Sequence, residues 1–386
     1  MPYLPDELML RILDEFTISD PRIARANGQR GCQDSVRTLH SLCLVTRDFH
    51  RLTESYLYRA YMKPDSNHVS IIKDNYIGSV THTSRLTIPP NKSLRQFINR
   101  LIDRPDLAQH VEYISLDRWR NESSPYLDDD FQESPPTCEK AKLFNEAAAQ
   151  SLVIKGVNGE AFDGTIRSRL GWLDSLEAGN EDAEIALLLA LTPNLAQLAI
   201  TLPDGTASGI QRRIDRPHFS RRVLSTTLAA MATSPASSGL PLMKLEHLTV
   251  SGHKTDGGTG FELDAMSHFL QLPSLRTLRA EAAVAHHERN NACNWGVGIG
   301  QSKLTHVQLD GSLFDARALE TILASCPLLE TFELRFGDQD NRGEYRIDFT
   351  RLGEALRLHC RGLKKLVLDP TKYDWRDRRD AMEPPW

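Results

Sequence analysis

The chain has 386 residues, 46 Lys and Arg against 51 Asp and Glu, and 40% apolar residues, so it is neither disordered nor collagen-like and could fill two or three domains. Its net charge of −5 gives no overall attraction to nucleic acid or to an anionic membrane. The longest apolar run, Ile185 to Leu191, is far below the ~20 residues of a membrane-spanning helix. Six scattered cysteines form no Cys-x-x-Cys pair, which argues against a zinc or dithiol site.

The N-terminal segment predicts an amphipathic helix over residues 4–16. Pro5 suits a first helical position, and Leu8, Ile12 and Phe16 recur every four residues. One broad apolar face of this helix therefore has to be covered by something. The segment has no secretory signal pattern, so we expect a soluble protein of the cytoplasm, the nucleus or both.

A loop and further helices are predicted next. Residues 17–34 contain Pro21 and Gly28 among polar residues and are typical of a loop. From Ser35, a suitable N-cap, apolar residues at helical spacing indicate one or two amphipathic helices that end near Arg59. Residues 1–62 thus predict a small helical module.

Leu4-Pro5-Asp6-Glu7-Leu8, followed by residues 42–49 and by Leu57-Tyr58-Arg59, resembles an F-box of the fungal type, with a linker longer than is usual for that family. The resemblance implies docking to the Skp adaptor of cullin-RING ubiquitin ligases. An alternative is that these helices only cap the rest of the chain. Some apolar residues of the module would pack in its own core and others would contact the Skp adaptor. These residues are Leu4, Pro5, Leu8, Ile12, Leu42, Val45, Phe49 and Leu57.

A strand phrase recurs in the remainder of the chain. Prolines 193, 273 and 327 stand two residues before its first leucine, where proline ends a helix and begins an extended segment. Helical patterns lie between the phrases, and a weaker copy covers residues 111–116. The six phrases of the form Leu-x-x-apolar-x-apolar begin at Leu195, Leu245, Leu275, Leu304, Leu329 and Leu363.

This alternation resembles the leucine-rich repeat family, which implies an α/β fold for residues 63–370: an irregular solenoid with a parallel sheet on one face and helices on the other. Insertions are expected near residues 120–139 and 203–222, and residues 371–386 form a tail. The alternative is a doubly wound α/β enzyme that uses residues 296–300 as a nucleotide loop, although that glycine pattern is incomplete.

Few residues suggest chemistry. Residues 120–139 carry one arginine and six acids and predict a solvated loop, whereas residues 210–222 carry five arginines and one acid and could bind an acidic segment or phosphate. His286, His287 and Cys293 lack the spacing of a metal site, and no nucleophile elbow is present. We therefore expect no enzyme activity, no metal and no cofactor.

The sequence predicts a substrate-recognition adaptor of an SCF-type (Skp-cullin-F-box) ubiquitin ligase. Its partners would be the Skp adaptor with its cullin ligase and an unknown protein substrate, with no nucleic acid and no membrane. The alternative is a leucine-rich-repeat scaffold with no link to ubiquitin. By two-residue alternation, the side chains on the open face of the sheet are Gln197, His247, Thr249, Thr277, Arg279, His306, Gln308, Thr331, Glu333 and Lys365.

Overall fold

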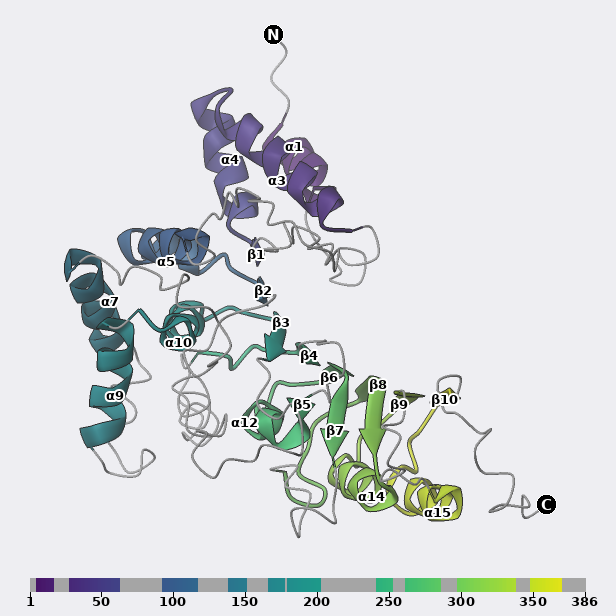
Figure 1. The fold of residues 1–386 in the computed structure, drawn as a ribbon. Coiled ribbons are helices and arrows are strands. Elements are labelled where there is room, and N and C mark those ends of the chain that lie inside the picture. Colours follow the sequence, from purple (N-terminus) through teal and green to yellow (C-terminus); the bar gives the residue numbers. More distant parts are fainter. Residues whose placement is uncertain are drawn as a thin grey trace, which may run out of the picture.

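The computed structural model shows an N-terminal group of helices followed by a long parallel sheet with helices along one side (Figure 1). The residues that it describes are 5–16, 28–62, 92–116, 138–150, 166–177, 179–202, 241–252, 261–285, 297–337 and 348–369. Several predictions lie outside these residues, namely those for Leu4, for 17–27, 120–137, 203–222 and 371–386, and for His286, His287 and Cys293.

The N-terminal module contains α1 (Asp6–Asp14), α3 (Gly28–Cys43) and α4 (Arg47–Leu57). The predicted first helix and the following pair of helices are confirmed. The prediction of a loop up to residue 34 and of an N-cap at Ser35 is wrong, because α3 already begins at Gly28. A helical glycine costs only ~1 kcal/mol, which packing of the apolar face of α3 against α1 and α4 can offset.

The turn between α3 and α4 is closed by a side-chain cap. The Thr46 hydroxyl accepts a hydrogen bond from the Phe49 amide at 3.2 Å, which satisfies one of the free donors at the start of α4. Inside the module, Leu13, Leu39 and Leu52 form a small core that is separate from the core of the sheet.

In the described parts of the chain, eight parallel strands follow one another in chain order, and each pairs with the strand before and after it in this set. All seven predicted strand phrases are confirmed. A shorter ladder of β5 (Phe261–Glu262) and β7 (Ala283–Ala285) also pairs with β8. The eight strands are β1 (Ala60–Met62), β2 (Tyr113–Leu116), β3 (Gln197–Leu202), β4 (His247–Gly252), β6 (Thr277–Glu281), β8 (His306–Phe314), β9 (Thr331–Phe336) and β10 (Lys365–Asp369).

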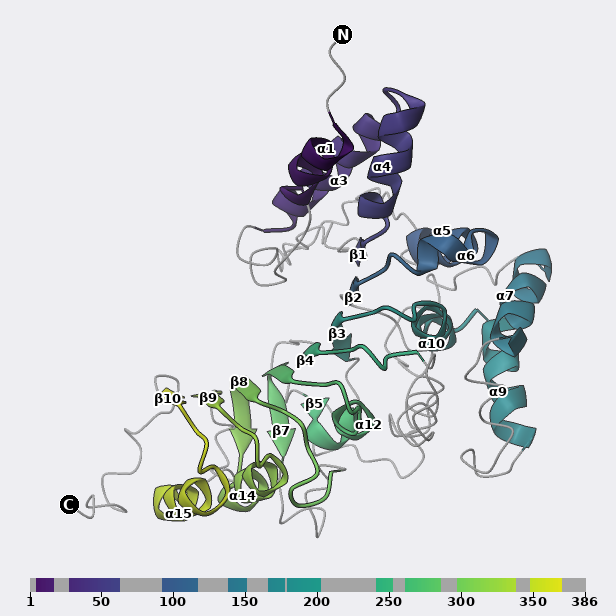
Figure 2. The ribbon, with the colours of Figure 1, turned by 180° about the vertical axis from the view of Figure 1, so that it is seen from behind.

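The helices of this region lie along one side of the sheet, as Figures 1 and 2 show from opposite directions. The helical patterns predicted between the strand phrases are confirmed. The helices are α5 (Lys92–Asp103), α6 (Pro105–Ala108), α7 (Cys138–Gln150), α9 (Ile166–Glu177), α10 (Glu181–Leu191), the 3₁₀ helix η3 (Leu263–Met266), α12 (Ser267–Leu270), α14 (Ala316–Ser325) and α15 (Phe349–His359).

This topology excludes the doubly wound alternative, because such a sheet reverses its strand order and carries helices on both faces. The proposed nucleotide loop does not have the required position either. The Gly300 amide donates to the Ala324 carbonyl at 2.9 Å and the Ser302 amide to Ser325 at 2.9 Å. Residues 297–302 therefore pack against the end of α14.

The core of the solenoid is a stack of inward-facing rows. The first leucines of five phrases, such as Leu245 and Leu304, are at most 1% exposed. The apolar run over residues 185–189 is fully buried in α10, which accounts for its composition. None of the helices within the described ranges is long and apolar enough to cross a membrane.

Candidate protein-binding surfaces

The N-terminal module exposes a set of apolar side chains that we call the N-terminal apolar patch: Leu8, Ile12, Leu44 and Val45. Their exposed fractions are 46%, 52%, 74% and 61%. Leu8 and Ile12 are four residues apart and share one face of α1. Leu44 and Val45 form the turn between α3 and α4.

Two polar contacts fix the direction of α1 against α4. Arg51 pairs with Asp6 at 2.8 Å, and the Tyr56 hydroxyl contacts Asp14 at 3.0 Å. The beginning of α1 is thus held beside the first half of α4, close to the turn that carries Leu44. These contacts place Leu8 toward the end of the module that carries Leu44 and Val45, and Ile12 one helical turn further along α1.

The residues expected to contact the Skp adaptor fall into two groups. Leu8, Ile12 and Val45 are exposed and available to a partner. Leu42 and Leu57 are partly buried against the module's own core, and Phe49 is also partly buried. Pro5 is exposed immediately before α1. Leu44 was missed, although two adjacent apolar residues between two amphipathic helices are a signal that could have revealed it.

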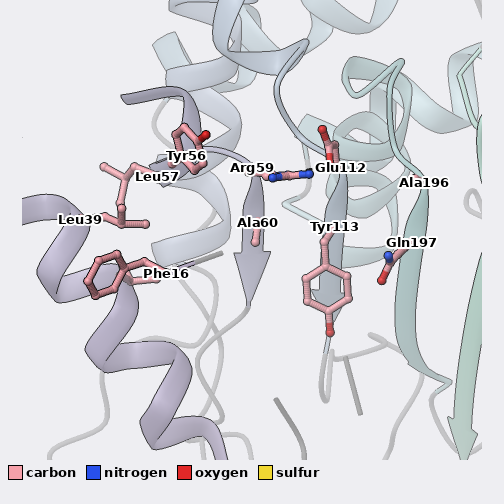
Figure 3. A pocket seen from close by; sticks show the side chains of 11 residues that line it. Phe16, Leu39, Tyr56, Leu57, Arg59, Ala60, Glu112, Tyr113, Ala196 and Gln197 are labelled. Carbon is pink, nitrogen blue, oxygen red and sulfur yellow. Dashed lines mark hydrogen bonds and ion pairs between the residues drawn. The ribbon is translucent and has the colours of Figure 1, made fainter. Parts of the chain in front are cut away.

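A cavity of about 140 Å³ lies where the module meets the first strands of the sheet (Figure 3). Apolar side chains form one side, and the paired Arg59 and Glu112, whose Nε and Oε2 atoms are 2.7 Å apart, form another. Sequence reasoning missed this cavity, because its walls come from segments far apart in the chain. The lining residues are Phe16, Val36, Leu39, Tyr56, Leu57, Arg59, Ala60, Glu112, Tyr113, Ala196 and Gln197.

The ten residues predicted on the open face of the sheet lie in two adjacent rows, and every one of them is exposed or half-buried. Because the strands are parallel and in register, equivalent residues stand side by side, one strand spacing of ~4.8 Å apart. The first row contains Gln197, His247, Thr277, His306, Thr331 and Lys365. The second row contains Thr249, Arg279, Gln308 and Glu333.

Ion pairs connect neighbouring strands on this face from β6 to β10. Asp310 pairs with Arg279 at 3.0 Å and with Arg335 at 2.7 Å. Arg335 also reaches Glu333 at 3.2 Å, and Glu333 in turn pairs with Lys365 at 2.5 Å. Asp310 and Arg335 were missed because they lie one alternation step beyond the six-residue phrase.

The face has a different character over β3 and β4. Its equivalent positions there carry small side chains, and the hydroxyls of Thr201 and Ser251 share a hydrogen bond of 2.8 Å. Ala199, Thr201 and Ser251 are each less than 10% exposed. Charged side chains on this face are therefore presented over β6 to β10, whereas β3 and β4 contribute Gln197 and His247 in the first row and small side chains beyond it.

The thiols of the described residues have the properties of packing groups. Burial raises the pKa of Cys326 to about 12 and that of Cys360 to about 11, so both stay protonated at neutral pH and are poor nucleophiles. Within the part of the chain that the structure describes, no group of three or more His, Cys, Asp or Glu side chains could hold a metal ion.

Parallel strands in chain order, with helices along one side, define a solenoid of strand–helix repeats. A family model for a leucine-rich repeat domain matches residues 91–356, well over half of the chain. The protein therefore belongs to the leucine-rich repeat family, whose extended repeat surfaces are protein-binding scaffolds. The N-terminal module precedes the matched region. A search of curated proteins found no match.

Proposed function

We propose that this protein is a substrate-recognition adaptor of an SCF-type ubiquitin ligase. In this proposal the N-terminal module docks the Skp adaptor, and thereby the cullin ligase, while the solenoid holds the protein to be ubiquitinated. The chain itself performs no chemistry and acts in the cytoplasm, the nucleus or both. The observation that carries the proposal is the N-terminal apolar patch on a module that resembles an F-box.

The patch is not needed for the module's own packing. Leu13, Leu39 and Leu52 supply the module's core, while Leu8 and Ile12 point away from it. Apolar surface left in water is unfavourable by roughly 25 cal/mol per Å², and contiguous exposed apolar patches typically mark interaction sites. A partner helix laid against α1 and the following turn would cover these side chains.

The charged part of the sheet face supports the second half of the proposal. Arg279, Glu333 and their ion-pair partners are held in position by each other, so they can bind a partner with little loss of side-chain entropy. Such a mixture of both charge signs fits a polar protein surface better than a membrane, which would select one sign.

Co-purification with the Skp adaptor tests the docking step. Leu8→Asp and Val45→Asp should each abolish co-purification, because each places a charge in the apolar contact. Leu328→Asp is the matched control, since Leu328 is 51% exposed on the solenoid, and it should retain the adaptor. Circular dichroism would establish that all three variants are folded. A folded wild-type chain that captures no Skp adaptor would refute the proposal.

A scaffold without a link to ubiquitin remains the second candidate, because the family match covers the repeats and not the module. The two candidates differ in whether the N-terminal apolar patch is needed for ubiquitination of a partner that is bound to the solenoid. In the adaptor, Leu8→Asp should leave partner binding intact but stop ubiquitination of that partner. If the protein is only a scaffold, the partner should be ubiquitinated to the same extent with the wild-type chain and with Leu8→Asp.

A further inference from the structure

The last repeat of the solenoid leaves its inward-facing side chain uncovered. Leu366 in β10 is 44% exposed, whereas Phe332 and Val307, at the equivalent positions of β9 and β8, are 0% exposed. Among the described strands β10 pairs with β9 alone, and Figures 1 and 2 place it at the end of the sheet. Within residues 5–369, as far as the structure describes them, the solenoid thus ends in a strand with one unpaired edge and an exposed apolar side chain.

The free edge of β10 also offers backbone hydrogen-bonding groups. The Lys365 amide donates to the Glu330 carbonyl at 3.0 Å, so Lys365 directs its backbone groups toward β9. Because successive residues of a strand direct their amides and carbonyls to opposite sides, those of Leu366 and Leu368 face the free edge. An edge of this kind is a template for another strand.

The side chains of β10 are complementary to those of a second, antiparallel copy of the same strand. If two copies pair around Val367, Lys365 of each lies opposite Asp369 of the other, and Leu366 lies opposite Leu368. Sliding the register by two residues places Lys365 opposite Val367 and loses both charge pairs. Sliding it by one residue turns the leucines toward the polar face.

We propose that two copies of this chain associate through β10 as an antiparallel, two-fold symmetric dimer with one continuous sheet. Leu366 and Leu368 form the hydrogen-bonded pairs, and Lys365 and Asp369 form the closer, non-hydrogen-bonded pairs on the polar face. The two-fold axis runs perpendicular to the sheet, so both α15 helices lie on the same face of the continuous sheet, and Leu366 and Leu368 of the two copies cover one another. The same patch serves both subunits, as a closed two-fold assembly requires.

The self-complementary pattern selects a second copy over other occupants of this edge. The dimer also leaves the N-terminal apolar patch accessible, because the module lies at the other end of the sheet (Figure 1). This inference stands independently of the adaptor proposal. If both hold, one assembly presents two docking modules and two substrate faces.

A charge-swap experiment on the full-length chain tests the dimer by light scattering coupled to size-exclusion chromatography. Lys365→Asp and Asp369→Lys should each weaken dimerisation at least about tenfold, because two symmetry-related pairs become repulsive together. Mixing the two variants should restore dimers, since every pair across that interface is again attractive. The double variant in a single chain should restore dimers as well.

Glu333→Gln is the control, because Lys365 also pairs with Glu333 within its own chain, and this variant should remain dimeric. A wild-type chain that is monomeric at about 100 µM would overturn the proposal, as would a charge-swap mixture that stays monomeric. A wild-type monomer that dimerises only after removal of residues 370–386 would overturn it too, since the tail would then be the occupant of the edge.

Discussion

The N-terminal module and the solenoid distribute their apolar side chains differently. The module buries Leu13, Leu39 and Leu52 and leaves Ile12 and Val45 in solvent. The solenoid buries its repeating leucines in continuous rows and presents polar side chains on the open face. Both regions therefore have a buried apolar core, and the module in addition leaves apolar side chains of α1 and of the turn before α4 in solvent.

The two regions are nevertheless built into one another. β1 follows directly after α4 and pairs with β2, so the module supplies the first strand of the sheet. The ring of Tyr61 in β1 stacks on Phe97 of α5 with centroids 4.4 Å apart. A protein bound to the module would therefore be held in a fixed relation to the sheet face, as an adaptor requires.

Truncating a core residue of the solenoid should give the largest effect on stability. Phe332 is 0% exposed in an inward-facing row, between Val307 and Leu366, so Phe332→Ala loses apolar burial and leaves a cavity. We expect the free energy of unfolding to fall by about 3–5 kcal/mol in urea titrations. Leu328→Ala, at an exposed position of the same repeat, should change it by less than about 0.5 kcal/mol. Equal losses in the two variants would contradict the assignment of the core.

The fold of the solenoid was largely predictable, because the alternation of inward-facing apolar and outward-facing polar residues can be read from each strand phrase by itself. Leu275, for example, is followed at fixed spacing by two inward-facing residues and preceded by Pro273, and all of these cues are local. β1 was not predictable in this way. Its phrase has Tyr61 in place of a leucine, and its pairing depends on β2, about 50 residues further along.

The candidate surfaces were predictable only where alternation determines them. The two rows of the sheet face follow from the strand phrase. The ion pairs of Asp310 need the spatial register of β6, β8 and β9, and the junction cavity needs the packing of the module against β1 and β2. The start of α3 at Gly28 escaped prediction because packing against α1 and α4 outweighed local propensity.

The buried thiol of Cys326 should make the solenoid sensitive to alkaline pH. Burial raises the pKa of Cys326 from 9.0 to about 12, so the unfolded chain releases this proton at lower pH than the folded chain. The stabilising contribution is therefore complete below pH 9.0 and is lost as the pH rises toward 12, by up to about 1.4 kcal/mol per pH unit. Between pH 9 and 10.5, wild type should lose about 1–2 kcal/mol more than Cys326→Ala in urea titrations. Parallel pH profiles would refute this.

Helix caps should give a smaller effect that separates the two regions. Asp315 caps α14 through the Ala318 amide at 2.7 Å, and Thr46 caps α4 at 3.2 Å. Asp315→Ala and Thr46→Ala should each cost about 1 kcal/mol, whereas Asp315→Asn should retain most of the cap. Hydrogen exchange would show faster amides in α14 for the first variant and in α4 for the second. Loss of protection throughout the chain from Thr46→Ala would mean that the two regions unfold as one unit.

Two neighbouring residues of α1 give the smallest predicted effect and the sharpest comparison. Ile12 is 52% exposed and Leu13 is 2% exposed, although the two are adjacent and similar in size. Ile12→Gln should change the free energy of unfolding by less than about 0.5 kcal/mol, because glutamine is a good helix former and no packing is lost. Leu13→Gln should instead destabilise the module by more than about 2 kcal/mol, since it places an amide in a small apolar core. Thermal melts of both variants, followed by far-ultraviolet circular dichroism, would measure the contrast. If Ile12→Gln weakens Skp-adaptor capture without lowering the melting temperature, the exposed face of α1 serves binding and not folding. A lowered melting temperature would instead assign Ile12 to the core.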